Sequence, residues 1–185
     1  MSTKSNITFI LGGARSGKSS HAQTLAQAAG RSVTFLATAQ ALDQEMSTRI
    51  QNHRAERPAG WETLEIPFDL TSHIQQIKSE VVILDCITLL ISNRLMQFVQ
   101  DDLVDEIPFT LAVQKEIEAM IAKIREQNRD WIIVSNEVGL GLVPPYQMGR
   151  AYRDALGWAN QRLAREADHV LFMVAGIPMV VKQIL

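Results

Sequence analysis

The chain has 185 residues, enough for one domain with a substantial core, and we expect residues 1–185 to form a single domain. Its composition, 46% hydrophobic and 21% charged, is ordinary for a globular protein, and a net charge of −2 gives no basic field for nucleic acid. No apolar run is long enough to predict a membrane span, the N-terminus does not resemble a signal peptide, and a single cysteine fits a reducing compartment. We therefore expect a cytoplasmic protein.

Short apolar segments alternate with helix-like segments along the first half of the chain. Ile7 to Leu11 has the composition of a buried strand, and Lys18 to Ala29 is rich in residues that favour helices. Gly30 is placed to cap that helix, and Ser32 to Thr38 predicts a second strand. The polar segment Asp43 to Arg57 predicts a partly exposed helix, which the following proline ends.

The same alternation continues to the C-terminal part of the chain. Further helices are predicted at Asp69 to Ser79, Cys86 to Val99, Phe109 to Gln127 and Tyr146 to Ala167, and further strands at Val81 to Asp85, Trp131 to Asn136 and His169 to Gly176. Strands that alternate with helices favour an α/β fold, in which helices cover both faces of a mostly parallel sheet.

A glycine-rich phosphate-binding motif lies between the first predicted strand and the first predicted helix. The motif G-x-x-x-x-G-K-[ST] is matched in full by Gly12, Gly13, Ala14, Arg15, Ser16, Gly17, Lys18 and Ser19. Glycines permit tight backbone geometry, so successive N–H groups can point at phosphate oxygens. Lys18 would neutralise the outer phosphates, and the Ser19 hydroxyl would bind Mg²⁺. The strand–loop–helix context favours a P-loop over a chance match.

A carboxylate ends the predicted strand Val81 to Asp85. In open α/β sheets the carboxyl ends of the strands face the ligand crevice, so Asp85 is a candidate partner for the Mg²⁺. The other interpretation is that Asp85 caps the next helix. We expect Cys86 to be a small buried residue and not a nucleophile.

The segment Arg49 to Glu65 contains groups that a P-loop does not itself require. Met46, Ile50 and His53 follow helical spacing, and His53 lies among the arginines Arg49, Arg54 and Arg57. A neutral imidazole is a good nucleophile toward phosphorus, and arginines can stabilise charge during transfer. Composition alone favours the other interpretation, a solvated helix face with one incidental histidine.

The loop Ser135 to Gly141, with the sequence SNEVGLG, follows a predicted strand. A polar strand end with a glycine-rich loop suits contact with a substrate or with the γ-phosphate, although an ordinary strand-to-helix connection fits equally well.

Five segments of the chain resemble the bifunctional adenosylcobinamide kinase/adenosylcobinamide-phosphate guanylyltransferase family of cobalamin biosynthesis. They are LGGARSGKSSHAQ, FLATAQALDQEMSTRIQNHRAERPAGWETLE, ILDCITLLISNRL, VSNEVGLGLVPPYQMGRAYRDALGWANQRLA and HVLFMVAGIPMVVK. They follow the order seen in the family and span nearly the whole chain, from Ile7 to Lys182.

This resemblance implies two reactions on one corrinoid substrate, adenosylcobinamide. ATP or GTP phosphorylates the hydroxyl of its aminopropanol arm, and GTP then guanylylates the resulting phosphate through a histidine–GMP intermediate. The family pattern R-I-x-x-H-[RK] falls on His53, and Asn52 stands where some relatives carry a second histidine.

The resemblance also implies a binding site, a fold and an assembly. Guanine-nucleotide contacts would fall on Gly12 to Ser19 and on Ala37, Thr38, Ala39, Arg54, Ala55, Glu56, Arg57, Glu65 and Asp85. The implied fold is a RecA-like, mostly parallel sheet with one antiparallel strand, and the implied assembly is a homotrimer. Two other hypotheses remain at this point: a P-loop small-molecule kinase without nucleotidyl transfer, and a RecA-like nucleotide switch that binds a protein partner.

Overall fold

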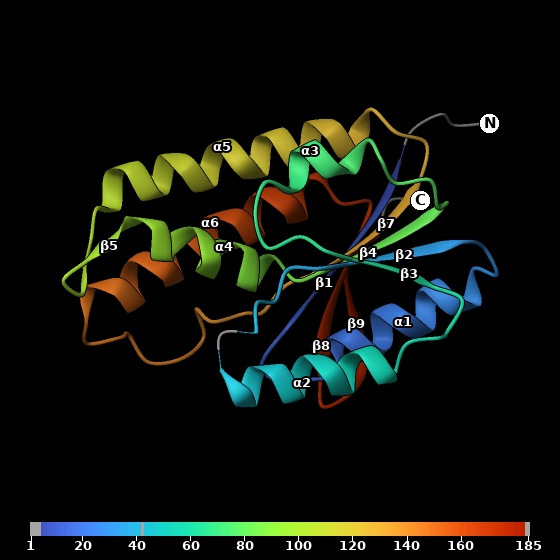
Figure 1. Cartoon of the computed structure of the whole chain (residues 1–185), viewed down its shortest axis with the longest axis horizontal. Coiled ribbons are helices and arrows are strands. Elements are labelled where there is room, and N and C mark those ends of the chain that lie inside the picture. The colour runs from blue at the N-terminus through green and yellow to red at the C-terminus, as the bar shows by residue number, and fades with distance from the viewer. Residues whose placement is uncertain (1–4, 42, 184–185) are drawn as a thin grey trace.

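A mostly parallel sheet forms the centre of the molecule (Figure 1). The computed structural model describes residues 5–41 and 43–183, without the side chains of Glu45 and Arg49. Within them a seven-stranded sheet has the order β3-β2-β4-β7-β1-β8-β9. Its strands are β1 (Asn6–Gly12), β2 (Val33–Ala37), β3 (Glu62–Glu65), β4 (Val81–Asp85), β7 (Asp130–Val134), β8 (His169–Val174) and β9 (Ile177–Gln183). All neighbouring strands pair in parallel except β8 and β9, which are antiparallel.

Helices cover both faces of this sheet, as the sequence predicts. They are α1 (Lys18–Ala28), α2 (Gln44–Ala55), α3 (Leu70–Ile74), α4 (Ile87–Leu95), η1 (Met96–Phe98), α5 (Glu106–Arg125) and α6 (Gln147–Glu166). Figure 1 shows α1 and α2 on one side and α3 to α6 on the other. A small hairpin of β5 (Val99–Gln100) and β6 (Leu103–Val104) precedes α5. Among the described residues, no helix is both long and apolar enough to cross a membrane.

The two faces of the sheet are packed by side chains of different size. Large residues such as Phe9, Phe109 and Trp131 fill the layer under α3 to α6, and each is completely buried. On the opposite face Ala22 and Ala26 of α1 are completely buried against the sheet. Because alanine side chains are short, α1 lies close to the strands. The P-loop, which precedes α1, therefore lies at the carboxyl end of the central strand β1.

The structure differs from the sequence prediction at the edges of the sheet. Residue patterns did not identify β3, whose sequence ETLE lies half exposed at one edge, or β9, whose IPMVVKQ lies exposed at the other. The β8–β9 turn is Ala175–Gly176, and both residues have positive φ, as a two-residue hairpin requires. The antiparallel strand implied by the resemblance is therefore present. The predicted helix Asp69 to Ser79 was too long, because α3 ends at Ile74.

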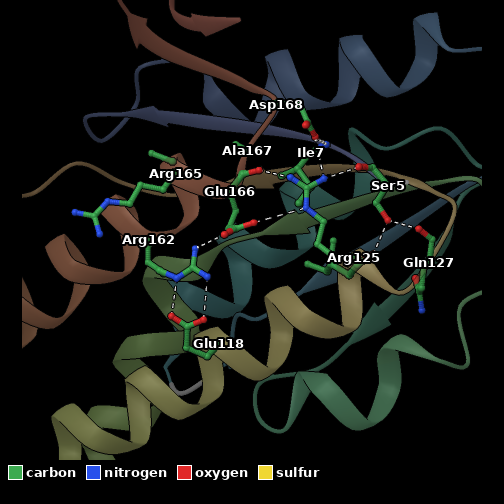
Figure 2. Close-up of polar contacts among 12 residues, drawn as sticks. Ser5, Ile7, Glu118, Arg125, Gln127, Arg162, Arg165, Glu166, Ala167 and Asp168 are labelled. Atoms are coloured by element: carbon green, nitrogen blue, oxygen red, sulfur yellow. Dashed lines mark hydrogen bonds and ion pairs between the residues drawn. The ribbon is translucent and has the colours of Figure 1, made fainter. Parts of the chain in front are cut away.

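A network of charged groups joins the elements at the amino edge of the sheet, where β1 and β8 begin (Figure 2). Arg125 at the end of α5 donates to the Ser5 carbonyl at 2.6 Å, to Asp168 Oδ2 at 3.1 Å and to the Glu166 carbonyl. Asp168 in turn accepts the Ile7 N–H at 2.8 Å. These contacts tie two helices and two strands together at the edge opposite the phosphate-binding motif.

Candidate functional site

A cavity of about 420 Å³ lies at the carboxyl ends of the parallel strands. This is where ligands bind in open α/β sheets. Of the residues predicted from the sequence, the cavity is lined by Ala14, Arg15, Ser16, Gly17, Lys18, Ser19, Ala37, Ala39, His53, Arg57, Glu65 and Asp85. Gly12, Gly13, Thr38, Arg54, Ala55 and Glu56 are not among its lining residues. The structure thus brings segments from four separate parts of the chain into one site.

Two glycines permit the conformation of the phosphate loop. Gly12 has φ +154°, and a Cβ there would lie 2.6 Å from the Met173 carbonyl oxygen and 2.7 Å from Ser16 Oγ. Gly17 has φ +91° and forms the N-cap of α1. The loop curls around Lys18, whose Nζ donates to the Gly13 carbonyl at 2.6 Å and whose surface is only 7% exposed. The N-terminus of α1 therefore faces the cavity together with a cation, which suits an anionic ligand.

Asp85 lies at the end of β4, with Ser19 beside it. Burial raises the pKa of Asp85, and this is opposed by a hydrogen bond from Ser19 and by the charges of His53, Arg57 and Lys18. A hydroxyl and a carboxylate oxygen are suitable ligands for Mg²⁺, which takes its remaining ligands from phosphates and water. No group of three or more histidine, cysteine, aspartate or glutamate residues suited to a metal occurs in the described part of the chain. The residues present therefore fit a magnesium ion that arrives with a nucleotide.

His53 reaches the cavity from the exposed helix α2. Asp43 caps this helix by accepting the Met46 N–H at 2.7 Å. Met46, Ile50 and His53 all line the cavity, as expected for residues on one helical face. The imidazole Nδ1 lies 3.7 Å from Glu56 Oε2, and the side chain is 42% exposed. His53 thus lines the cavity while its side chain remains partly exposed to solvent. Arg49 was also a candidate, but its side chain lies outside the described part of the structure.

Arg57 is held against the cavity wall by an aromatic ring. Its guanidinium carbon lies 3.7 Å from the centroid of the Phe35 ring, and Nη1 lies 3.4 Å from Thr63 Oγ1. Burial lowers the pKa of Arg57, and Asp85 partly opposes this effect. Its buried Nε has no hydrogen-bond partner among the described residues. Arg54, in contrast, is exposed and pairs with Glu65 at 3.7 Å.

Thr38, predicted to contact the nucleotide, is completely buried. Its hydroxyl donates to the Cys86 carbonyl at 2.7 Å and accepts the Cys86 N–H at 2.9 Å. The Thr38 carbonyl accepts a hydrogen bond from Asn93 at 2.8 Å. The peptide bond between Asp85 and Cys86 is cis. The Thr38 side chain therefore positions the backbone beside Asp85, because its hydroxyl is already bonded to that backbone.

Residue patterns did not single out several further cavity residues, among them Phe35, Thr88 and Leu89, whereas Asn136 belongs to the loop Ser135 to Gly141 that was expected to contact a substrate. Thr88 Oγ1 accepts the Asn136 N–H at 2.7 Å. Beneath it the buried Asn160 accepts from Ser135 Oγ at 2.7 Å and donates to the Asn136 carbonyl at 3.0 Å. These bonds fix Asn136 at the end of β7. The polar pair Ser135–Asn136 at a strand end was the one sequence signal for this network.

The cysteine in the cavity is not activated. Burial and the neighbouring Asp85 raise the pKa of Cys86 to about 12. The thiol therefore stays protonated near neutral pH, which agrees with the expectation that Cys86 is not a nucleophile, although the residue is half-buried and not fully buried.

Together, the fold and the cavity define a P-loop nucleotide-binding protein with a RecA-like sheet. The strand β7 separates the P-loop strand from the strand that ends in Asp85. A solved structure, the RadB recombinase, is similar over 90% of this chain and 73% of its own, with a TM-score of 0.51 and 14% identity. At that identity the likeness supports the fold alone.

Sequence comparison identifies the family of P-loop proteins to which the chain belongs. The model of the family described as cobinamide kinase/cobinamide phosphate guanyltransferase matches residues 8–181. The bifunctional adenosylcobalamin biosynthesis protein CobP of Pseudomonas aeruginosa is 42% identical over 176 residues, covering 94% of this chain and 96% of the relative. CobU of Escherichia coli and CobU of Salmonella typhimurium are each 38% identical over 181 residues, covering 95% of this chain and 99% of each relative. The chain belongs to this enzyme family of adenosylcobalamin biosynthesis.

Proposed function

We propose that this protein uses one phosphate cradle for both reactions of its family. In the first, ATP or GTP phosphorylates the aminopropanol hydroxyl of adenosylcobinamide. In the second, GMP passes from GTP to the new phosphate through His53, giving adenosylcobinamide-GDP and pyrophosphate. The observation that carries this proposal is that His53 lines the same cavity as Lys18 and Ser19 of the P-loop.

The guanylyl transfer divides into two displacements at phosphorus. An imidazole nitrogen of His53 bonds to the α-phosphorus of GTP while the bond to the bridging oxygen breaks, and pyrophosphate leaves with that electron pair. A phosphate oxygen of the acceptor then attacks the same phosphorus, the nitrogen–phosphorus bond breaks, and His53 regains its lone pair. Covalent catalysis of this kind lets one site serve two bulky partners in turn.

The chain provides cations where negative charge develops. Lys18 lies within the loop that would hold the leaving phosphates, and Arg57 lies across the cavity over Phe35. Ser19 and Asp85 would hold Mg²⁺, which neutralises charge on the phosphate oxygens. His53 attacks through the lone pair of a ring nitrogen.

The remaining nucleotide contacts are proposed in three groups. The cavity supports direct contact by Ala37, Ala39, Glu65 and Arg57, and backbone contact by the loop from Ala14 to Ser19. For Gly12 and Gly13 the proposal rests on the P-loop motif. For Thr38, Arg54, Ala55 and Glu56 the proposal rests on family resemblance alone, since they are not among the lining residues.

We further propose that the protein is a cytoplasmic homotrimer in which residues 1–185 form one domain and no nucleic acid is bound. One continuous sheet supports the single domain. The exposed apolar residues of β9, which include Ile177, Met179 and Val181, support contact between subunits. The net charge of −2 supports the absence of a nucleic-acid partner, and the single cysteine fits the cytoplasm.

Incubation with GTP labelled at the α-phosphate tests this function. A covalent label that is stable to base and labile to acid is expected here, and neither a simple kinase nor a nucleotide switch would form one. Lys18→Ala should reduce both the labelling and the phosphorylation of adenosylcobinamide, because both use the same cradle. Unchanged nucleotide affinity and turnover in Lys18→Ala would contradict a shared site.

A further inference from the structure

The segment between β7 and α6 exposes large apolar side chains to solvent. Leu140 is 82% exposed and Leu142 is 96% exposed, and Val143 and Tyr146 are also exposed. We call these four side chains the apolar loop patch. Single exposed apolar residues are common on protein surfaces, but four within seven positions of one loop are typical of an interaction site.

This loop is held in one conformation by its own hydrogen bonds. At its start, Glu137 Oε1 accepts the Gly139 N–H. At its end, Arg150 Nη1 on α6 donates to the Pro144 carbonyl at 3.2 Å and to the Pro145 carbonyl at 2.7 Å. The loop also packs closely on α6, since a Cβ on Gly149 would lie 2.7 Å from Pro144 Cβ. A preformed surface of this kind loses little conformational entropy when it binds a ligand.

The loop that carries the apolar loop patch begins at the phosphate cavity. The loop begins directly after Asn136, which lines the cavity, and the Glu137 N–H donates to the Gly12 carbonyl at 3.0 Å. In Figure 1 it leaves the end of β7 near the centre of the sheet and runs outward to the start of α6. The same loop therefore connects the cavity, at Asn136, with the apolar loop patch.

The size of the cavity means that a large acceptor can place only part of itself inside. Its volume of about 420 Å³ is near the lower end of ordinary ligand pockets, which range from about 300 to 1,000 Å³. A nucleotide held by the P-loop would occupy this space. The ring of a corrinoid acceptor is too broad to share it, so the ring must lie outside while its aminopropanol arm enters.

From these observations we propose that the apolar loop patch is the platform for the corrin ring of the acceptor. Leucine and valine side chains pack against the apolar parts of the macrocycle, and Tyr146 offers an aromatic ring for its conjugated face. The inference rests on the proposed function, because it takes a corrinoid as the acceptor. A second copy of the chain is the competing occupant. The origin of the loop at the cavity favours the acceptor, and β9 offers a separate exposed apolar surface for subunit contact.

The double variant Leu140→Ser/Leu142→Ser tests the platform without disturbing the core, because both side chains are exposed. We expect the KM for adenosylcobinamide in the kinase reaction to rise roughly 10- to 100-fold, the loss associated with two apolar contacts. The KM for the nucleotide should stay as in the wild type. Self-labelling by α-labelled GTP, which needs no corrinoid, should also be unchanged. Leu111→Ser on α5 is the matched control, since Leu111 is exposed but lies outside this loop.

A truncated acceptor makes the test more specific. Aminopropanol without the corrin ring should be phosphorylated equally slowly by the wild type and by the double variant, because the patch has no ring to contact. An unchanged KM for adenosylcobinamide would overturn the platform alone. Dissociation of the wild-type oligomer in the double variant, measured by light scattering, would assign the patch to a second copy and overturn it too. Failure of the wild type to phosphorylate adenosylcobinamide would overturn the proposed function as well.

Discussion

Replacing Arg57 should weaken nucleotide binding while changing the thermal stability of the free protein little. This guanidinium is buried against Phe35, its burial lowers its pKa, and its Nε has no acceptor among the described residues. A phosphate oxygen would supply the missing acceptor. Arg57→Lys keeps the charge but loses the planar fork, and Arg57→Met keeps a flexible apolar stem over Phe35 without the charge.

The size of the effect follows from the bonds at stake. One hydrogen bond from a charged donor contributes about 1.5–3 kcal/mol, so GTP should bind Arg57→Lys about 10- to 150-fold more weakly. At a GTP concentration about 1,000-fold above the wild-type Kd, a 100-fold loss lowers the stabilisation by GTP from about 4.1 to about 1.4 kcal/mol. For a chain of this length the GTP-induced rise in Tm should shrink by about 5–10 °C.

Thermal unfolding with and without GTP measures both quantities. Without nucleotide, Arg57→Met should change the melting temperature little, because relief from burying the Arg57 charge is offset by the loss of its attraction to Asp85. Arg54→Met is the comparison for stability without nucleotide, since Arg54 is exposed and its pair with Glu65 contributes at most about 1 kcal/mol. Wild-type GTP affinity in both Arg57 variants would refute this account of the cavity.

Three further predictions concern the loop, the scaffold and the thiol. Gly12→Ala places a Cβ 2.6 Å from a carbonyl oxygen, so it should lower the free energy of unfolding by about 1–3 kcal/mol and abolish most GTP binding. Gly13→Ala, whose Cβ meets nothing within 4 Å, should change neither quantity. Equal unfolding curves and equal GTP affinities for the two variants would contradict this prediction. Arg125→Met should lower the free energy of unfolding in urea by about 3–5 kcal/mol, because it leaves buried partners unpaired. GTP affinity should stay unchanged, since these partners lie at the end of the sheet opposite the phosphate loop. A loss of stability under about 1 kcal/mol would argue against the network. At pH 8 iodoacetamide should modify Cys86 about 10³-fold more slowly in the folded protein than in urea. The reason is that a pKa of about 12, in place of 9.0, lowers the fraction of thiolate by about that factor. Equal rates would show that Cys86 has the pKa of an ordinary thiol.

The sequence identified the parts of the site that have local signatures. A P-loop is recognisable because its glycines, lysine and serine act through one short stretch of backbone, and the structure has that loop between β1 and α1. Asp85 was identifiable for a similar reason, since a carboxylate at the end of an apolar strand is a local pattern. His53 needed family resemblance, because one histidine on a polar helix carries little information by itself.

The features that were missed depend on contacts between distant residues. The stacking of Arg57 on Phe35 joins the end of α2 to β2, and the bonds around Asn136 join β7 to α4 and α6. Thr38 stays a predicted nucleotide contact, but the bond from its hydroxyl to Cys86, 48 positions away, has no signature in the sequence. The edge strands β3 and β9 lack buried apolar patterns because each pairs on one side only. Such features arise from packing, which periodicity does not report.

The central claim is that His53 carries the guanylyl group, and one measurement tests it directly. Wild-type protein and the His53→Ala variant are incubated with α-labelled GTP, and the labelled peptide is identified after digestion. The account predicts an acid-labile, base-stable label on the wild-type peptide that contains His53, and no label on the variant, which should still phosphorylate adenosylcobinamide. A label that persists in His53→Ala, or one found on another peptide, would contradict it.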